Sequence, residues 1–348
     1  MAYPVFKKGF PLFATDGAGR AGSPRGEEIV SLSTRKMYDA GAYVFTEELA
    51  QAINVALLLG MPLLVTGEPG AGKTELGRAV AYELGAGDPL TFETKSTSQA
   101  RDLFYTYDAL GRFAAKEIGG DVQPQSYIRY HALGLAILNA FQREHIGQFL
   151  AQSAQHQGPK RSVVVIDEID KAPRDFTNDL LNEIARMAFR VPELGNIATP
   201  GMDGGEGVPA NLRPIVIITS NSERGLPDPF LRRCVYFHIP FPEGPALKEI
   251  VSKRVEGLDP NSPLATDALE LFVRIRDDHM QPVVQKKPGT AELLNWLQFL
   301  GARGVTSQTS LRRPDQLANV SGSIFALVKT QDDLEAVRAY LPTWCGGG

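Results

Sequence analysis

A glycine-rich octapeptide has the residue types and spacing of a phosphate-binding loop. Its residues are Gly67, Glu68, Pro69, Gly70, Ala71, Gly72, Lys73 and Thr74. They match the pattern GxxxxGK[ST], in which backbone N–H groups and the start of a helix surround an anion. We therefore expect Lys73 to contact the β- and γ-phosphates of a nucleotide and the Thr74 hydroxyl to ligate Mg²⁺. The alternative is a glycine-rich turn without a ligand, which the apolar run before the loop and the helical pattern after it disfavour.

A second apolar run ends in the carboxylates that such a loop requires. Residues 163–166 are apolar, and Asp167, Glu168 and Asp170 follow them. Open α/β sheets bind ligands at the carboxyl ends of their strands, so Asp167 is expected to help hold Mg²⁺ there. Glu168 fits the general base that polarises an attacking water. Asp170 fits a helix cap or an ion pair better, and a strand that simply ends in solvated acids is the alternative interpretation.

A third apolar run and a pair of arginines complete the set of candidate catalytic residues. Asn221 follows residues 215–220, and its amide could hold the attacking water or the γ-phosphate. A turn-initiating asparagine is the alternative. Arg232 and Arg233 end a short helical segment, and adjacent arginines on a helix face different directions. One could pack inward or form a salt bridge, while either could cross a subunit interface to neutralise γ-phosphate charge.

Short apolar runs alternate with amphipathic helical stretches between residues 43 and 241. Five of these runs read as buried parallel strands, at 63–66, 90–94, 163–167, 215–220 and 234–239. Helical patterns, for example at 75–84 and 176–187, separate the strands. Strand alternating with helix predicts an α/β fold of three layers, with a parallel five-stranded sheet covered on both faces.

The two flanking regions lack this alternation. Residues 1–42 mix Gly, Pro, Ser and charged residues with little periodicity, which predicts an irregular arm. The pattern from 242 to 348 is entirely helical, which predicts a separate all-α domain. Its helices are expected at 246–255, 266–280, 290–301, 314–328 and 332–340. The domain boundaries are therefore predicted near residues 43 and 242.

Composition excludes several classes of protein. The chain has 36 Lys and Arg against 40 Asp and Glu, a net charge of -4, so no basic excess attracts nucleic acid. The longest apolar run, residues 55–65, contains Gly60 and Pro62 and is far shorter than the ~20 residues that cross a bilayer. The cysteines, Cys234 and Cys345, cannot form a disulfide framework, and the N-terminus does not resemble a signal peptide. These features predict a cytoplasmic protein without a membrane span.

Together the motifs resemble those of AAA+ ATPases. The octapeptide corresponds to the Walker A motif, residues 163–168 to Walker B, Asn221 to the first sensor, and residues 228–233 to the D-x-x-L-R-R tail. The helical region from residue 242 is similar to the lid domain of that superfamily. The details most resemble the MoxR type, within the helix-two-insert clade.

Two segments carry the resemblance to that clade. Residues 97–131 form an apparent insertion, and residues 189–214 lie where the clade has a hairpin ahead of the first sensor. The first segment interleaves tyrosine and phenylalanine with arginine. Its aromatic residues could pack in a core, line a pore that presses on a protein, or stack on nucleic acid.

One position departs from the family's pattern. Where a lid helix usually begins with a second-sensor arginine, this chain has Gly289 or Thr290. Lys287 could substitute, although lysine lacks the guanidinium fork. Arg312 and Arg313 are weaker candidates, and a solvated helix start is the alternative for that pair.

The resemblance implies an ATPase that uses Mg²⁺, assembles as a homo-oligomeric ring, expected to be hexameric, and remodels or activates a protein client. The clients of this family often carry a von Willebrand factor A domain. This chain lacks the DxSxS pattern of that domain, so such a client would be a separate polypeptide. Nucleic acid is not the expected partner.

Three other functions remain open alternatives. A nucleic-acid-associated motor or a GTP-using motor of the same clade would share most of these motifs, although the [NT]KxD motif of GTPases is missing from the sequence. A small-molecule kinase with a phosphate loop would need neither Asn221 nor the paired arginines nor a helical lid.

Overall fold

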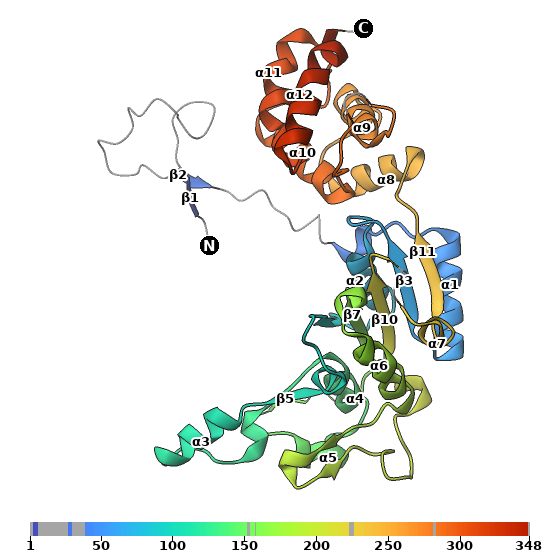
Figure 1. Cartoon of the computed structure of the whole chain (residues 1–348), viewed down its shortest axis with the longest axis vertical. Helices are drawn as coiled ribbons and strands as arrows, with labels where there is room; N and C mark the ends of the chain where they lie inside the picture. The colour runs from blue at the N-terminus through green and yellow to red at the C-terminus, as the bar shows by residue number, and fades with distance from the viewer. Residues whose placement is uncertain are drawn as a thin grey trace. The chain divides into compact units, whose positions relative to one another are not determined.

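Two compact units make up the part of the chain that the structure, a computed structural model, describes (Figure 1). The described residues are 3–5, 27–29, 39–151, 154–156, 158–222, 226–280 and 283–346. One unit comprises residues 43–243, and the other comprises residues 1–42 and 244–348. The first is an α/β unit and the second is mainly helical.

A parallel sheet of five strands forms the centre of the α/β unit (Figure 1). Its strands in spatial order are β11 (Val235–Ile239), β3 (Leu63–Gly67), β10 (Ile215–Ser220), β7 (Val163–Asp167) and β4 (Leu90–Glu93). Thr66 of β3 lies opposite Ser220 of β10, and Asp167 of β7 lies opposite Glu93 of β4. The carboxyl ends of these strands therefore meet at one edge. The predicted α/β fold with five parallel strands is confirmed.

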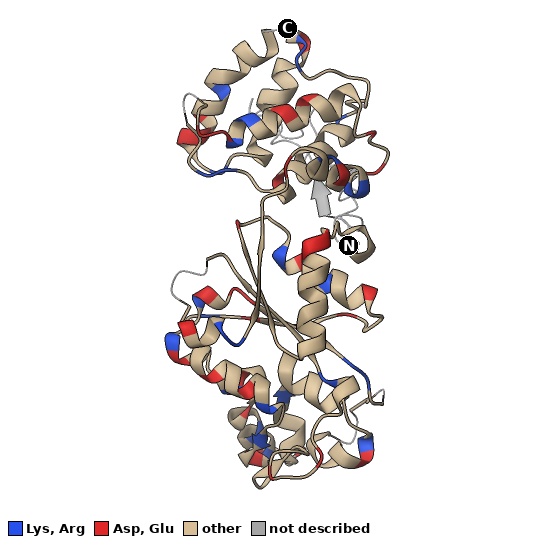
Figure 2. Ribbon diagram, turned by 90° about the vertical axis from the view of Figure 1, so that its right-hand side faces the viewer, with Lys and Arg blue, Asp and Glu red and all other residues tan. Residues whose placement is uncertain are grey.

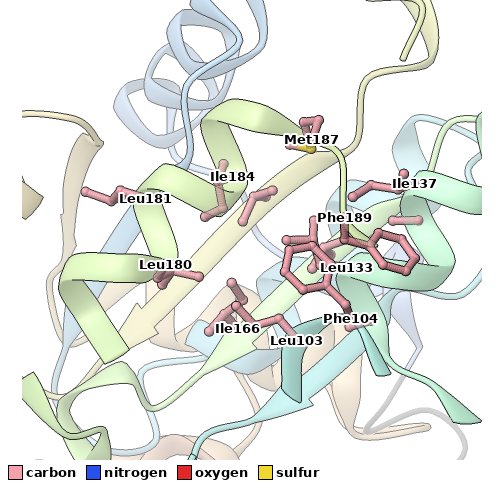
Figure 3. Packing of buried hydrophobic residues seen from close by; sticks show 14 of the residues in the cluster. Leu103, Phe104, Leu133, Ile137, Ile166, Leu180, Leu181, Ile184, Met187 and Phe189 are labelled. Carbon is pink, nitrogen blue, oxygen red and sulfur yellow. The ribbon is translucent and has the colours of Figure 1, made fainter. Parts of the chain in front are cut away.

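Helices cover both faces of this sheet. They are α1 (Glu47–Leu59) and α2 (Lys73–Glu83) on one face, and α4 (Ala132–Asn139) and α6 (Arg174–Arg186) on the other. Successive residues of a strand point to opposite faces, so Leu63 and Val65 pack in the first core and Leu64 packs in the second. Figure 3 shows the second core, where residues of α4 and α6 surround Ile166 and Phe189.

Local chemistry determines where α1 begins and ends. Thr46 Oγ1 accepts a hydrogen bond from the backbone N of Leu49 at 3.2 Å, which satisfies one donor of the first turn. Gly60 ends the helix with a φ of 62°, in the left-handed region that favours glycine. The chain then returns to the sheet and enters β3.

Two insertions interrupt the alternation of strands and helices. The first contains β5 (Tyr105–Tyr107), α3 (Ala109–Glu117) and β6 (Ile128–Tyr130), and β5 pairs with β6 in antiparallel fashion. The second is a short hairpin of β8 (Arg190–Val191) and β9 (Ile197–Ala198). They lie within the segments that the sequence analysis set apart, 97–131 and 189–214. The resemblance implied a hairpin in the second segment, whereas the pairing of β5 with β6 was not predicted.

The aromatic residues of the first insertion divide between core and surface. Phe104 and Tyr105 are 4% and 2% exposed and belong to the second core. Phe113 on α3 is 65% exposed, and Leu110 and Ile118 beside it are 83% and 85% exposed. Core packing therefore explains the aromatic residues Phe104 and Tyr105 but not the exposed apolar residues of α3.

Side chains connect the two insertions directly. Glu193, which follows β8, accepts hydrogen bonds from Arg101 Nη2 at 2.5 Å and from the Tyr105 hydroxyl at 2.8 Å. The guanidinium carbon of Arg101 lies 4.8 Å from the ring centroid of Tyr105. Burial raises the pKa of the Tyr105 hydroxyl, the donor to Glu193, to about 12. Phe189 stacks on Phe104 with ring centroids 5.0 Å apart.

Helix α4 approaches the first insertion so closely that only glycine fits at position 134. A Cβ atom at Gly134 would lie 2.1 Å from the backbone oxygen of Phe104, and that oxygen also accepts from His131 N at 2.8 Å. We expect Gly134→Ala to lower the free energy of unfolding by about 1–3 kcal/mol, because the backbone must move to accept the methyl group. Thermal or urea denaturation measures the change. Gly147→Ala, where nothing lies within 4 Å of the added carbon, is the control; equal stability of the two variants would contradict the prediction.

The second unit is built from five helices in its described residues. They are α8 (Gly244–Arg254), α9 (Pro263–Arg276), α10 (Thr290–Ala302), α11 (Leu317–Ser323) and α12 (Gln331–Gly346). None of the helices in the described ranges is long and apolar enough to cross a membrane. From the N-terminal residues, β1 (Tyr3–Val5) pairs with β2 (Glu27–Ile29) and a 3-10 turn covers Ala40–Ala42. The rest of the predicted irregular arm, up to residue 38, lies outside the described residues.

Three predicted helices of this unit were wrong in extent. Within the predicted helix 314–328, only α11 is α-helical; the 3-10 turn η9 (Pro314–Gln316) precedes it and the 3-10 turn η10 (Ile324–Ala326) follows it. The low helix propensity of Ser321, Gly322 and Ser323, the last residues of α11, favours its end there. The predicted helix 266–280 ends at Arg276, and the predicted helix 332–340 continues to Gly346. Pro342 lies inside the latter helix, which a pattern-based boundary does not anticipate.

Candidate functional site

The glycine-rich loop joins β3 to α2 at the carboxyl edge of the sheet. Gly67 and Gly72 have φ values of 154° and 88°, in a region that favours glycine. A Cβ atom at Gly67 would also lie 2.6 Å from the backbone oxygen of Ile239 in β11. The first glycine is therefore required both by its conformation and by the neighbouring strand.

Lys73 lies buried at the start of α2, with 7% of its surface exposed. Its Nζ donates hydrogen bonds to the backbone oxygens of Gly67 at 2.8 Å and Glu68 at 3.0 Å, so the ammonium group is folded onto the loop. Burial lowers the pKa of Lys73, while the charges of nearby carboxylates, that of Asp170 foremost, oppose this change. The loop therefore contains a desolvated cation beside backbone N–H groups, which suits an anion.

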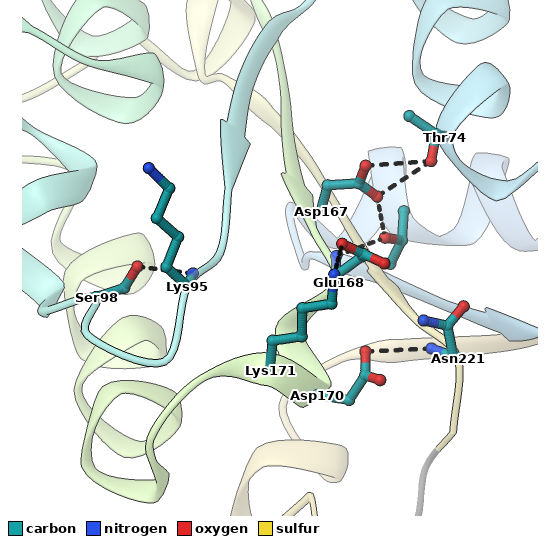
Figure 4. Close-up of polar contacts among 9 residues, drawn as sticks. Thr74, Lys95, Ser98, Asp167, Glu168, Asp170, Lys171 and Asn221 are labelled. Carbon is teal, nitrogen blue, oxygen red and sulfur yellow. Dashed lines mark hydrogen bonds and ion pairs between the residues drawn. The ribbon is translucent and has the colours of Figure 1, made fainter.

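The two oxygen donors expected to hold Mg²⁺ are in direct contact (Figure 4). Thr74 Oγ1 donates to the carboxylate of Asp167, with distances of 3.2 Å to Oδ1 and 3.1 Å to Oδ2. Hydroxyl and carboxylate oxygens are the ligand types that Mg²⁺ takes in proteins, usually together with water and substrate phosphates. The residues present therefore fit a magnesium ion that arrives with a nucleotide.

Thr219 joins this group, although the sequence analysis assigned it no role. It is fully buried in β10, and its hydroxyl donates to Asp167 Oδ1 while accepting from the backbone N of Glu168 at 3.0 Å. Thr219 thereby fixes the carboxylate and the turn that follows it. One feature of the sequence could have pointed to this role: Thr219 is a hydroxyl residue near the carboxyl end of an otherwise apolar strand.

Glu168 occupies a strained position immediately after β7. Its φ is 56°, and it begins the 3-10 turn η6 (Ile169–Lys171). The carboxylate is partly exposed at the edge of the sheet and forms an ion pair with Lys171 Nζ. This hydrogen bond to Glu168 raises the pKa of Lys171. The predicted general base is thus ion-paired in this structure.

Asn221 follows β10 directly, next to the turn that carries Glu168 (Figure 4). Its backbone N donates to Asp170 Oδ1 at 3.2 Å. Asp170, for which the sequence predicted a helix cap or an ion pair, instead contacts the end of the neighbouring strand. The structure therefore brings Thr74, Asp167, Glu168 and Asn221 to one edge of the sheet.

Arg232 and Arg233 follow the short helix α7 (Asp228–Leu231), and both are exposed. Arg233 Nη1 donates to Asn182 Oδ1 of α6 at 3.1 Å. Within the described residues, neither arginine forms a hydrogen bond or ion pair with the phosphate loop or its carboxylates. Within a single chain, these two arginines therefore do not join the other predicted site residues at the edge of the sheet.

Each cationic candidate for the second sensor forms an ion pair within the helical unit. The pairs are Lys287 with Asp278, Arg312 with Glu270, and Arg313 with Asp315. Gly289 and Thr290 form the start of α10, where Gly289 N donates to Glu292 Oε2 at 3.1 Å. In this structure the charged side chains of Lys287, Arg312 and Arg313 are thus engaged within the helical unit.

Comparison with known proteins supports one superfamily. Residues 60–191 match a family model described as an AAA domain, and this range includes the phosphate loop, Asp167 and Glu168. The chain is also 25% identical over 239 residues to the Lon protease of Xanthomonas oryzae pv. oryzae (strain KACC10331 / KXO85). That alignment covers 66% of this chain and 23% of the relative, so the chain spans less than a quarter of its length. Residues 60–191 are thus similar to an AAA domain, which supports an AAA+ ATPase, and the five-stranded parallel sheet has the α/β architecture expected of one.

Proposed function

We propose that the protein is a MoxR-type AAA+ ATPase that hydrolyses ATP with Mg²⁺. The contact between Thr74 and Asp167 carries the proposal, because it joins the phosphate loop to the acidic end of β7 at 3.1 and 3.2 Å. The matched AAA domain supports nucleotide binding. The MoxR branch rests on the resemblance of the motifs and on the positions of the two insertions.

In the proposed reaction, the phosphate loop and Lys73 bind the β- and γ-phosphates. The hydrogen bonds of Lys73 Nζ to the backbone oxygens of Gly67 and Glu68 would be exchanged for bonds to phosphate oxygens, in which the acceptor is charged as well as the donor. Thr74 and Asp167 would hold Mg²⁺, which neutralises charge on the phosphates.

The carboxyl ends of β7 and β10 would supply the hydrolytic groups. Glu168 would polarise the attacking water once its carboxylate is released from the ion pair with Lys171. Asn221, on the adjacent strand, would orient the water or the γ-phosphate. A cation at the developing γ-phosphate charge would come from Arg232 or Arg233 of a neighbouring subunit.

We further propose that the protein forms a homo-oligomeric ring, taken to be hexameric, in the cytoplasm and acts on a protein client, for example one with a von Willebrand factor A domain. The exposed apolar residues of α3, Leu110 and Phe113, suit contact with a protein. In the view of Figure 2, basic and acidic residues are interspersed along the ribbon, which favours a protein client over nucleic acid.

The assay that tests nucleotide binding uses Lys73→Ala. We expect no measurable binding of a fluorescent ATP analogue at concentrations that saturate the wild type, because the variant loses the cation that would contact the phosphates. Lys116→Ala, which removes an exposed lysine of α3, should bind like the wild type. Undiminished affinity of a folded Lys73→Ala protein would refute the assignment of the loop, and stronger competition by GTP than by ATP would change the proposed nucleotide.

A further inference from the structure

The backbone pairing of β7 and β10 ends before the two strands reach the candidate catalytic residues. The last paired residues are Ile166 and Ile218. Beyond them β7 turns away, because Glu168 adopts a left-handed conformation with a φ of 56°. The N–H group of Asn221 therefore faces a turn instead of a strand.

Asp170 provides a hydrogen-bond acceptor for the Asn221 N–H group, which β7 no longer pairs with at this point. Its Oδ1 accepts from Asn221 N at 3.2 Å. This hydrogen bond restricts the position of the Asn221 backbone relative to the turn that carries Asp170. The turn that carries Asp170 is itself anchored, because the preceding residue, Ile169, is fully buried in the core.

We propose that Asp170 is a positioning residue for hydrolysis, which fixes the backbone of Asn221 and so orients the Asn221 side chain. This inference rests on the proposed ATPase function. Asp170 touches neither phosphate nor water in this role and acts through Asn221. Because catalytic groups must be held closely, a displacement of about 1 Å can slow a reaction by up to about 10²-fold.

Asp170 could instead act on the site through its charge. Asp170 is the foremost of the carboxylates whose charge counteracts the burial of Lys73. If this charge were the main contribution of Asp170, both Asp170→Asn and Asp170→Ala would change nucleotide affinity. The positioning role predicts a different pattern, because the amide oxygen of asparagine can still accept from Asn221 N.

The experiment measures steady-state ATP hydrolysis by Asp170→Ala, Asp170→Asn and the control Asp179→Ala. Asp179 is an exposed acid on α6, outside the site. We expect Asp170→Ala to lower kcat about 10-fold or more with KM within about threefold of the wild type. Asp170→Asn should retain most of kcat, and Asp179→Ala should match the wild type. Equal losses in both Asp170 variants, or an effect confined to KM, would overturn the proposal.

A double-mutant cycle with Asn221→Ala then tests whether the effect passes through Asn221. Because the side chain to be oriented is missing in that background, adding Asp170→Ala should cause no further loss of kcat. Additive losses would refute the positioning role even if the protein is an ATPase. A wild-type protein that binds ATP but does not hydrolyse it would instead refute the proposed function. Circular dichroism spectra of all variants establish that they are folded.

Discussion

Replacing both Arg232 and Arg233 with alanine is expected to leave ATP affinity nearly unchanged and to reduce hydrolysis by about 10³-fold or more. The transition state spreads negative charge over the γ-phosphoryl oxygens, and an arginine positioned there stabilises it. Lys73 is the cation that the chain's own loop supplies, while both arginines are exposed and without a hydrogen bond or ion pair to that loop in the described residues. The arginines would therefore act on the site of a neighbouring subunit.

Mixing two inactive variants tests this arrangement. Subunits with Lys73→Ala retain the arginines, and subunits with both arginines replaced retain the loop, so a mixed ring contains some complete sites. Phosphate release should recover partly as one variant is titrated into the other. Activity of the double-arginine variant alone would contradict the prediction, as would mixed assemblies that stay inactive at every ratio.

Single substitutions then separate the two arginines. Arg233 is held by Asn182 at 3.1 Å, whereas Arg232 is exposed and has no such bond in the described residues. The variant that reproduces the loss of the double variant identifies the arginine that acts on the neighbouring site.

Glu168→Gln is expected to preserve ATP binding and to slow turnover by a factor on the order of 10² or more. Glutamine has nearly the same shape as glutamate but cannot accept the proton of the attacking water. The loop, Thr74 and Asp167 remain intact in this variant, so the nucleotide should still bind. Binding of a fluorescent ATP analogue and phosphate release, measured on the same preparation, separate the two effects.

The control for this variant is Glu117→Gln, which alters an exposed carboxylate at the end of α3. It should hydrolyse ATP at the wild-type rate. Hydrolysis by Glu168→Gln near the wild-type rate would mean that another residue acts as the base. A slow Glu168→Gln variant that binds ATP should also retain its client, which can then be identified by co-purification.

The sequence predicted the sheet, and the position of the glycine-rich loop between a strand and a helix, because both depend on local patterns. Each strand is a short apolar run, and the glycines of the loop mark conformations that few other residues adopt, as the φ of 88° at Gly72 illustrates. The spatial order of the strands was not predictable in this way. Periodicity reports which residues are buried but not which strand lies beside β3.

Contacts between residues far apart in the chain could not be predicted from the sequence either. Thr219 and Asp167 are far apart in the chain, so the hydroxyl that holds the carboxylate could be recognised only once β10 and β7 were adjacent. The contact of Asp170 with Asn221 depends on the same adjacency. In the helical unit, Pro342 lies inside α12, where a local pattern would predict the end of a helix.

The bonds between Glu193 and the first insertion bear on the construction of chimaeras. Replacing residues 97–131 alone with a segment from a relative would remove Arg101 and Tyr105, the two donors to Glu193. The side chain of Glu193 is only 17% exposed, so its carboxylate would be left poorly solvated and without these donors. Residues 97–131 and 189–214 therefore behave as one cassette, and a graft that changes specificity should transfer both segments together.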